Sequence, residues 1–338
     1  MNLFGKDLDR DIPIIAEIGV NHEGDLETAI TLMRLARDAG ADAAKFQTFT
    51  PERYASASDP DRLQRVRGFD LGEDGFRRIA EEAEKDGFPV FSTAVSEDVV
   101  PFLAGLFPVL KIASGDIDFE PVIRAAAETG KPVILSTGLA TEEEVDAAVG
   151  WFRDGAGTED IRDRLVLMHC VSAYPTPIKE ANVMSIPYLS ERTGLRIGYS
   201  NHIIGPEACL AAVALGACAI EIHFTDRKEG REFRDHALSC DADDLARLVE
   251  TVPRIRASLG RREKQRQPSE MENLIAVRKG VVAARDLEAG AVLSRDDLMF
   301  ARPASEYPAS EIDSLPGARL KAAVGKGELI RRDNVDFG

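Results

Sequence analysis

The stretch IPIIAEIGVNHEGDLETAITLMRLARDAGADAAKFQT, residues 12–48, decides the fold class of this chain. It begins with an apolar run of strand length, continues with apolar and charged residues at helical spacing, and ends with a second apolar run. Both runs carry polar residues near their ends, Glu17 in the first and Lys45 and Gln47 in the second. Apolar strands that alternate with amphipathic helices are typical of a parallel sheet covered by helices.

Six further runs repeat this pattern along the first three quarters of the chain. They are PVFSTA (89–94), PVLKIAS (108–114), PVILSTG (132–138), LVLMHC (165–170), LRIGYS (195–200) and CAIEIHF (218–224). Eight such repeats over about 250 residues predict an α/β fold of the (β/α)8 TIM-barrel type. In such barrels the active site lies at the carboxyl ends of the strands, where the sequence places the following polar residues: Glu17, Lys45, Gln47, Thr93, Lys111, Ser114, Ser136, Thr137, His169, Ser200, His202, Glu221 and His223. Any one of them alone is equally compatible with a capped turn or a surface side chain.

A second, smaller unit is expected after the barrel. The stretch GRREKQRQPSEMEN (260–273) is polar, has no apolar periodicity and indicates a linker. Beyond it, GAVLSRDDL (290–298) resembles GELIRRDNV (327–335), which predicts a small β-rich module with internal pseudo-symmetry. We therefore predict a catalytic barrel over residues 1–260, a linker over 261–274 and a C-terminal domain over 275–338. Because so short a module holds only a small core, we expect it to dock onto a partner surface.

Composition limits the classes of function. A net charge of −16 over 338 residues argues against nucleic acid as a partner. No stretch has the length and apolarity of a membrane span or a secretory signal, so we expect a cytoplasmic protein without a membrane partner. Four cysteines, Cys170, Cys209, Cys218 and Cys240, form no CxxC pair and are expected to be buried thiols. A nucleophilic Cys170 is the alternative.

Two histidines at neighbouring strand ends predict a divalent-metal site. His202 follows the seventh run and His223 lies in the eighth, so both imidazoles are expected in one mouth. A two-histidine site that leaves coordination positions open suits an octahedral ion such as Mn²⁺. Glu17, across the mouth, is a candidate general base. Three alternatives stay open: core histidines, a Glu17 that only pairs with Lys45, and a metal-dependent hydrolase.

An anionic substrate is also expected. Lys45 and Lys111 supply local positive charge in an otherwise acidic protein. The hydroxyls of Thr93, Ser114 and Ser136 are suited to satisfy phosphate oxygens. The alternative is that both lysines merely pair with carboxylates of the barrel.

Taken together, the motifs resemble the sialic acid synthase family. In chain order they are IAEIGVNHEG, AKFQTF, FSTA, KIASGD, ILSTG, HCVSAYPTP, IGYSNH and EIHFTDR, and ARDLEAGAVLSRDDLMFARP resembles the antifreeze-like (SAF) domain that ends these enzymes. The resemblance implies a transferase (EC 2.5.1.-) that condenses phosphoenolpyruvate with the open-chain aldehyde of N-acetylmannosamine or a related amino sugar and releases phosphate. It also implies a divalent metal, Mn²⁺ with Mg²⁺ or Co²⁺ as alternatives, and a domain-swapped homodimer.

The resemblance further implies roles for single residues. Glu17, His202 and His223 match catalytic positions, and the two histidines match the metal ligands. Residues matched to phosphoenolpyruvate binding are Lys45, Thr93, Lys111, Ser114, Ser136, Ser200 and Glu221. Residues matched to sugar contacts are Gln47, Tyr174, Asp235 and Arg302, the last lent by the SAF domain of one subunit to its partner.

Three departures from the family pattern lie on the sugar side. Residues 48–70 form a shorter segment than in bacterial N-acetylneuraminate synthases and lack an asparagine-bearing loop, REFRD replaces the usual PGPD before Asp235, and Ser172 stands where some members have asparagine. The product is therefore left open among sialic, legionaminic and pseudaminic acids. A phosphorylated-sugar 3-deoxy acid phosphate synthase and a non-catalytic carbohydrate-binding protein on the same fold also stay open.

Overall fold

The computed structural model describes residues 1–231 and 233–338. Eight parallel strands close into a barrel in the order β10-β3-β4-β5-β6-β7-β8-β9. The strands are β3 (Ile14–Gly19), β4 (Ala43–Thr48), β5 (Val90–Ala94), β6 (Leu110–Ile112), β7 (Val133–Ser136), β8 (Leu165–His169), β9 (Arg196–Asn201) and β10 (Ile220–His223). Each apolar run carries one strand, with β9 extending one residue past its run, so the predicted (β/α)8 barrel is confirmed. A small hairpin, β1 (Asn2–Leu3) with β2 (Lys6–Asp7), precedes it.

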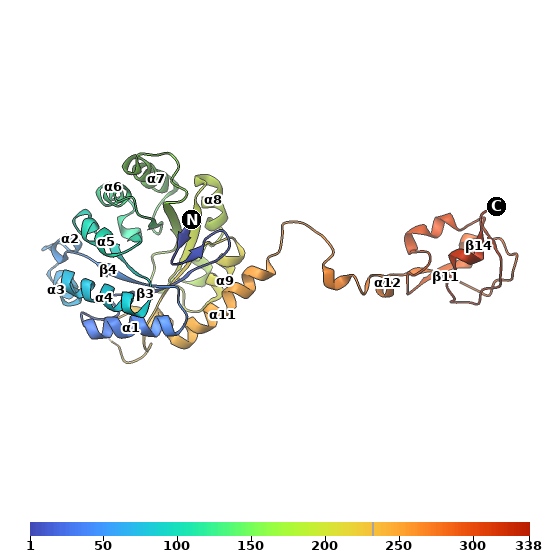
Figure 1. The fold of residues 1–338 in the computed structure, drawn as a ribbon, viewed down its shortest axis with the longest axis horizontal. Coiled ribbons are helices and arrows are strands. Elements are labelled where there is room, and N and C mark those ends of the chain that lie inside the picture. Colours follow the sequence, from blue (N-terminus) through green and yellow to red (C-terminus); the bar gives the residue numbers. More distant parts are fainter. Residues whose placement is uncertain (232) are drawn as a thin grey trace. The chain divides into compact units, whose positions relative to one another are not determined.

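Helices surround the barrel (Figure 1). They are α1 (Leu26–Asp38), α4 (Gly72–Asp86), α5 (Val100–Leu106), α6 (Glu120–Glu128), α7 (Glu142–Ala156), α8 (Ser185–Thr193), α9 (Glu207–Ala214) and α11 (Ala242–Ser258). Two of them show why they begin where they do. Asp25 caps α1 by accepting from the N–H of Thr28 at 2.6 Å, and Thr141 and Glu144 form a capping box on α7. Such caps satisfy N–H groups that the first turn of a helix leaves free.

Three short helices lie in loops after strands. α2 (Pro51–Tyr54) and α3 (Pro60–Phe69) are inserted between β4 and α4, and α10 (Asp235–Leu238) follows β10. Loops that follow the strands of a barrel build its active-site face. The segment 48–70 is therefore on that face.

The register of the barrel aligns the polar residues of neighbouring strands. Glu17 of β3 pairs with Lys45 of β4 on one side and with His223 of β10 on the other. Glu221 of β10 pairs with Ser200 of β9. The β10–β3 pairing that closes the ring therefore brings residues more than half a chain apart into one site.

The chain divides into two compact units, Met1–Gly260 and Arg261–Gly338. The second unit has a hydrophobic core of its own, which includes Val281, Leu298, Leu315 and Val335. Its elements are α12 (Leu274–Val277) and the antiparallel pairs β11 (Gly280–Ala283) with β12 (Leu298–Ala301) and β13 (Arg319–Leu320) with β14 (Val335–Asp336).

The two resembling segments of this unit have similar structures. In the first, a 3₁₀ turn at Arg295–Asp297 leads into β12, and in the second a 3₁₀ turn at Arg332–Asn334 leads into β14. Each segment begins with a glycine at positive φ, 85° at Gly290 and 84° at Gly327, where other residues are strained. The pseudo-symmetry expected from the sequence is therefore present in the backbone.

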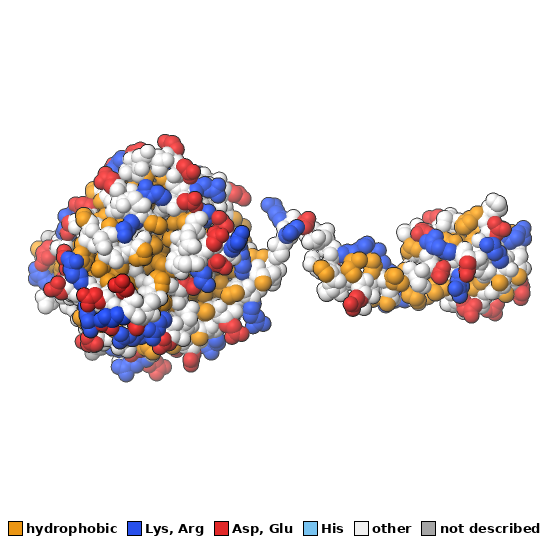
Figure 2. Space-filling model, in the orientation of Figure 1, with side chains coloured by type: hydrophobic (Ala, Val, Ile, Leu, Met, Phe, Trp, Pro, Cys, Tyr) orange, Lys and Arg blue, Asp and Glu red, His pale blue; other side chains and the backbone are white. Residues whose placement is uncertain are grey.

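Charged side chains of both signs are interspersed over the face shown in Figure 2, so the net charge of −16 does not form one acidic patch there. Cys170, Cys209, Cys218 and Cys240 are buried free thiols, as predicted. None of the helices in residues 1–231 and 233–338 has both the length and the apolarity needed to cross a membrane.

Candidate active site

A cavity of about 850 Å³ contains nearly all residues that the sequence assigns to the site. Its size lies within the usual range of small-molecule sites. The assigned residues that line it are Glu17, Lys45, Gln47, Thr93, Lys111, Ser114, Ser136, Tyr174, Ser200, His202, Glu221, His223 and Asp235. Residues that are up to 218 positions apart in sequence, such as Glu17 and Asp235, therefore face one space.

Two lysines and two glutamates form a buried ionic cluster in this cavity. Nζ of Lys45 lies 2.5 Å from Oε2 of Glu17 and 3.8 Å from Oε1 of Glu221. Nζ of Lys111 lies 3.1 Å from Oε2 of Glu221. None of the four residues is more than 5% exposed. Since buried charges persist only when paired, the pairing of both lysines with barrel carboxylates explains how they remain ionised while facing a ligand site.

The two glutamates of the cluster differ in acidity. Burial and the nearby Glu221 raise the pKa of Glu17 to about 7, although Lys45 opposes the shift. Burial acts on Glu221 as well, but Lys111 and Lys45 outweigh it and lower its pKa to about 2. Glu17 therefore exchanges a proton near neutral pH, which suits a general acid or base, while Glu221 stays ionised. When Glu17 is protonated, the cluster has an excess positive charge that favours an anionic ligand.

Hydroxyl groups extend the cluster along one side of the cavity. Nζ of Lys111 donates to Oγ of Ser136 at 2.6 Å, and Nζ of Lys45 donates to Oγ1 of Thr93 at 3.2 Å. The hydroxyl of Ser200 donates to Oε1 of Glu221 at 2.9 Å. Lysines and hydroxyls in this proximity provide the donors that a phosphate or carboxylate requires.

Gly138 shapes a cradle of small side chains after β7. A Cβ at this position would lie 2.3 Å from Oγ of Ser172, 2.8 Å from Oγ of Ser114 and 2.9 Å from Sγ of Cys170, so only glycine fits. Oγ of Ser172 is buried and has no hydrogen-bond partner among the described residues. A buried hydroxyl in this state is available to a ligand oxygen.

Cys170 does not have the properties of a nucleophile. Burial raises the pKa of its thiol, and its Sγ lies 3.1 Å from Oγ of Ser114. Because the thiolate is the reactive form, this environment argues against the cysteine alternative.

His202 and His223 lie side by side, with ring centroids 5.3 Å apart. Nδ1 of His202 is 2.6 Å from the carbonyl of Val171; a carbonyl only accepts, so Nδ1 carries the proton and Nε2 keeps its lone pair. Burial lowers the pKa of both imidazoles, which keeps them in the neutral form that binds metals. The pair therefore fits one divalent ion. No group of three or more His, Cys, Asp or Glu that could hold a metal ion is found in the described part of the chain, so a metal at this place would rest on the two imidazoles.

Loop residues line the cavity beside the histidine pair. The ring of Tyr174, in the loop after β8, lies 4.3 Å from the ring of His202. The guanidinium of Arg234 lies 5.5 Å from the centre of the Tyr174 ring, and its Nε lies 3.3 Å from Oδ1 of Asp235. Aromatic, cationic and anionic groups thus face the space beside the histidine pair.

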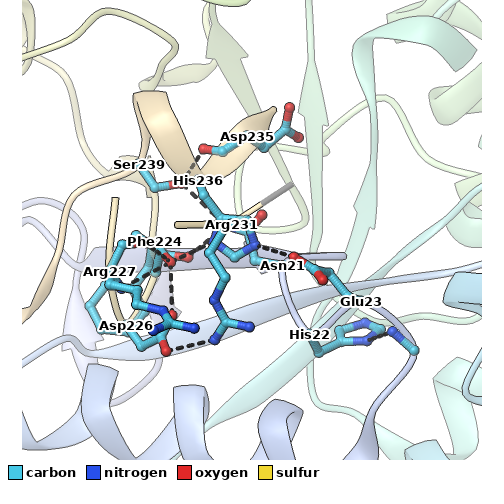
Figure 3. A network of polar contacts seen from close by, with 12 residues as sticks. Asn21, His22, Glu23, Phe224, Asp226, Arg227, Arg231, Asp235, His236 and Ser239 are labelled. Atoms are coloured by element: carbon cyan, nitrogen blue, oxygen red, sulfur yellow. Dashed lines mark hydrogen bonds and ion pairs between the residues drawn. The ribbon is translucent and has the colours of Figure 1, made fainter. Parts of the chain in front are cut away.

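A buried network fixes the loop that carries Asp235 (Figure 3). His236 is fully buried; its Nε2 lies 2.9 Å from Oε1 of Glu23, in the loop after β3, and its Nδ1 lies 2.6 Å from Oγ1 of Thr225. The hydroxyl of Ser239 donates to the carbonyl of Asp235 at 2.6 Å. The loop after β10 is therefore tied to the loop after β3 by a histidine that bonds at both ring nitrogens. We call Glu23, His236 and Thr225 the Glu23–His236 tie.

Comparisons with known proteins assign both units. A family model described as the NeuB family matches residues 32–264, and a model of the SAF domain matches residues 278–336. The chain belongs to the NeuB family. The resemblance to sialic acid synthases and the C-terminal SAF domain are both confirmed.

Individual relatives of this NeuB family member match along nearly its whole length. The N,N'-diacetyllegionaminic acid synthase of Legionella pneumophila is 33% identical, over 96% of this chain and 94% of that protein. Human N-acetylneuraminate-9-phosphate synthase is 30% identical, over 96% and 92%. The structure of N-acetylneuraminic acid synthetase from Leptospira borgpetersenii in complex with citrate matches with a TM-score of 0.72 and 35% identity, over 78% of this chain and 90% of that one.

Two strand-end residues that the sequence analysis placed at the active-site face, Thr137 and His169, instead form hydrogen bonds with backbone carbonyls. Oγ1 of Thr137 donates to the carbonyl of Met168 at 3.2 Å, and Nε2 of His169 lies 2.9 Å from the carbonyl of Ala181. Neither Thr137 nor His169 is among the residues that line the cavity. Both hold loops in place.

Other residues that line the cavity were missed by sequence reasoning. Asp116 ends a 3₁₀ turn after β6, and burial and Asp118 raise its pKa to about 7. Arg62 lies on α3, and Arg234 follows β10. Their only sequence signal is a position in a loop after a strand, which many surface residues share.

Arg302 stands apart from the other assigned residues. It follows β12 in the C-terminal unit, where its Nε donates to the carbonyl of Val277 at 2.5 Å. Arg302 belongs to the second compact unit, and its contact with a sugar remains a prediction.

Proposed function

We propose that this NeuB family member condenses phosphoenolpyruvate with the open-chain aldehyde of an amino sugar of the N-acetylmannosamine type, giving a nonulosonic acid and inorganic phosphate. The observation that carries the proposal is one cavity that combines the Lys45–Lys111 cluster, Glu17 with a pKa near neutrality and the histidine pair. The named activities of the Legionella and human relatives support it.

The reaction makes one carbon–carbon bond and breaks one carbon–oxygen bond. C3 of phosphoenolpyruvate attacks the aldehyde carbon, water adds at C2, and the bond between C2 and the phosphate oxygen breaks to leave a ketone. The added water supplies the ketone oxygen and loses both of its protons: one ends on the former aldehyde oxygen and the other on the departing phosphate. Glu17 is the residue suited to take up or deliver a proton in these steps, because its pKa lies at about 7.

We assign phosphoenolpyruvate to the side of the cavity that contains the lysines. Lys45 and Lys111 offer positive charge, and Ser136 and the cradle around Gly138 offer hydroxyl donors. The sugar then occupies the wall formed by Tyr174 and Asp235. Holding both substrates in contact lowers the barrier by proximity.

We propose that His202 and His223 hold a divalent ion, with Mn²⁺ first and Mg²⁺ or Co²⁺ as alternatives. Such an ion supplies Lewis-acid polarisation of the acceptor carbonyl. In calorimetric titration with Mn²⁺, His202→Ala and His223→Ala are expected to lose binding. His169→Ala, at a buried histidine bonded to Ala181, is the matched control and should retain it. Retained Mn²⁺ binding in both site variants would remove the metal assignment.

We also propose a domain-swapped homodimer in which the partner subunit supplies Arg302 to the sugar side. A mixture of Glu17→Gln and Arg302→Ala chains, each expected to be impaired alone, tests this arrangement. If Arg302 acts on the partner's barrel, one site of each mixed dimer has both native residues and activity returns. If Arg302 acts within its own chain, every site has one defect, and the absence of rescue would contradict the swap.

The function itself is tested by phosphate release from phosphoenolpyruvate with a panel of amino sugars and Mn²⁺, with mass spectrometry of the products. A nine-carbon keto acid formed together with phosphate supports the proposal. A metal-dependent hydrolase predicts turnover that needs no phosphoenolpyruvate, and a binding protein predicts no turnover. We place the reaction in the cytoplasm, where phosphoenolpyruvate is formed. The human relative is named for a phosphorylated product, N-acetylneuraminate 9-phosphate, and it matches over 96% of this chain, including the SAF domain. The presence of the SAF domain therefore does not decide between a free and a phosphorylated acceptor sugar.

A further inference from the structure

A second hollow, of about 760 Å³, adjoins the active-site cavity. We call it the side hollow. The residues that line both spaces are Val20, Gln47, Tyr54, Arg62, Phe233 and Arg234. Gln47 connects it to the chemistry, because its Nε2 donates to Oε1 of Glu17 at 3.2 Å. A ligand that reaches past Gln47 from the active site therefore enters the side hollow.

The floor of the side hollow is apolar and aromatic. Val20, Phe49 and Val66 belong to a hydrophobic cluster separate from the barrel core, against which Phe69 and Phe233 pack. The rings of Phe69 and Phe233 meet edge to face with centroids 5.1 Å apart. This floor is suited to the carbon skeleton of a substituent, not to a solvated sugar hydroxyl.

Arginines supply most of the charge around this floor. Among the described residues that line the side hollow, Arg62, Arg65 and Arg234 face a single carboxylate, Glu23, whose Oε1 is already bonded by His236. This local excess of positive charge occurs in a chain whose net charge is −16. It is therefore opposite in sign to the protein as a whole.

The segment that contains α2 and α3 carries Arg62 and Arg65 and two further arginines, Arg53 and Arg67. Both of these further arginines form ion pairs. Arg53 pairs with Glu97, and NH2 of Arg67 lies 2.7 Å from Oε1 of Glu52. By contrast, no carboxylate in the described part of the chain forms an ion pair with Arg62 or Arg65. Arg67, which does not line the side hollow, is therefore paired, whereas Arg62 and Arg65, which line it, are not. The charges of Arg62 and Arg65 are available to a ligand.

We infer, given the proposed function, that the acceptor sugar carries a substituent remote from its aldehyde that ends in an anionic group, a carboxylate or a phosphate, bound by Arg62 and Arg65 in the side hollow. Guanidinium groups match both anions in a bidentate manner and offer no such advantage for a neutral hydroxyl. The proposed function places phosphoenolpyruvate beside Lys45 and Lys111, and neither lysine is among the residues that line the side hollow.

The test compares four acceptors with phosphoenolpyruvate and Mn²⁺. N-acetylmannosamine is compared with its 6-phosphate, and N-butanoylmannosamine with N-succinylmannosamine, so that the first pair reports on phosphate and the second on carboxylate. We expect kcat/KM to be about tenfold higher for the anionic member of at least one pair, the worth of a charge-assisted contact. The preference should weaken at high salt, because both arginines are exposed.

Two variants test whether the preference for anionic acceptors depends on Arg62 and Arg65. Arg62→Gln combined with Arg65→Gln is expected to abolish it by raising KM for the anionic acceptor alone. Arg67→Gln, on the same helix but paired with Glu52, is the matched control and should leave it unchanged.

Equal use of neutral and anionic acceptors overturns the inference and leaves the proposed function standing. An anionic preference that survives the double variant, or a double variant that impairs all four acceptors alike, also overturns it. No turnover of phosphoenolpyruvate with any acceptor overturns the proposed function itself, and the inference with it.

Discussion

The two sides of the active-site cavity are built by different means. Glu17, Lys45 and Lys111 stand on barrel strands, are at most 3% exposed, and are positioned by strand register. Tyr174 and Asp235 stand on loops, and Tyr174 is 38% exposed. We call these the strand-borne side and the loop-borne side. Backbone pairing therefore fixes the groups that we propose for the chemistry, whereas side-chain contacts between loops fix the groups that we propose for sugar binding.

The largest effect is expected from the strand-borne side at Glu17. Glu17→Gln removes the group that exchanges a proton and should lower kcat by about 10²–10⁴-fold. As pH falls through about 7, Glu17 becomes protonated, so wild-type kcat should fall on the acid side of that value if the residue acts as a base. The variant should lack this limb in a steady-state pH profile. A variant that keeps both the limb and most of the rate would exclude Glu17 from proton transfer.

Lys111 tests whether the ionic cluster also stabilises the barrel. Lys111→Met leaves Glu221 with Lys45 at 3.8 Å as its remaining cation and should cost about 3–5 kcal/mol of unfolding free energy at pH 7 in urea. The pKa of Glu221 is lowered in the folded state, so the ion pair stabilises above the unfolded value of about 4.5 and the benefit is lost as pH falls toward 2. The difference between variant and wild type should therefore shrink below pH about 4.5. A difference that does not depend on pH would contradict this account.

Gly138 tests the cradle on the strand-borne side. Gly138→Ala places a methyl group within 2.3 Å of Oγ of Ser172 and should raise KM for phosphoenolpyruvate about tenfold, with less change in KM for the sugar. Gly150→Ala on α7, where a Cβ meets no atom within 4 Å, is the control and should leave both constants unchanged. An unchanged KM for phosphoenolpyruvate in Gly138→Ala would place that substrate elsewhere.

The smallest effect is expected from the loop-borne side. Glu23→Gln weakens the Glu23–His236 tie and should raise KM for the sugar about three- to tenfold, while KM for phosphoenolpyruvate stays constant. Glu82→Gln provides a control for general destabilisation, because Glu82 is 8% exposed and pairs with Arg34 on the outside of the barrel. Parallel changes of both KM values in Glu23→Gln would show that the tie does not act on the sugar side alone.

The strand-borne side was predictable because its signal is local. Lys111 lies in the apolar run PVLKIAS, and strand periodicity with the barrel rule is enough to direct such a residue to the active-site face. The same rule also selected Thr137 and His169, which bond to backbone carbonyls instead. A position at the end of a strand does not determine which way a side chain turns in the loop that follows.

The loop-borne side was only partly predictable because its contacts are long-range. Glu23 and His236 are 213 residues apart, and nothing near either residue in the sequence indicates the other. Arg62 and Arg65 become candidate ligand-binding residues only through two structural facts: Arg53 and Arg67 are ion-paired while they are not, and the side hollow adjoins the active-site cavity. Tyr174 and Asp235 were assigned through family resemblance, not through periodicity.

The pairing of β10 with β3 also sets the order of events on the ribosome. Glu17 emerges early, but its neighbour His223 is synthesised about two hundred residues later. Until that last strand arrives, β3 and β9 present unpaired edges that can associate with other chains. A nascent chain that stops before residue 220 therefore lacks Glu221 and His223 and leaves the edges of β3 and β9 unpaired. We expect premature termination to give an aggregation-prone fragment and not a weakened enzyme.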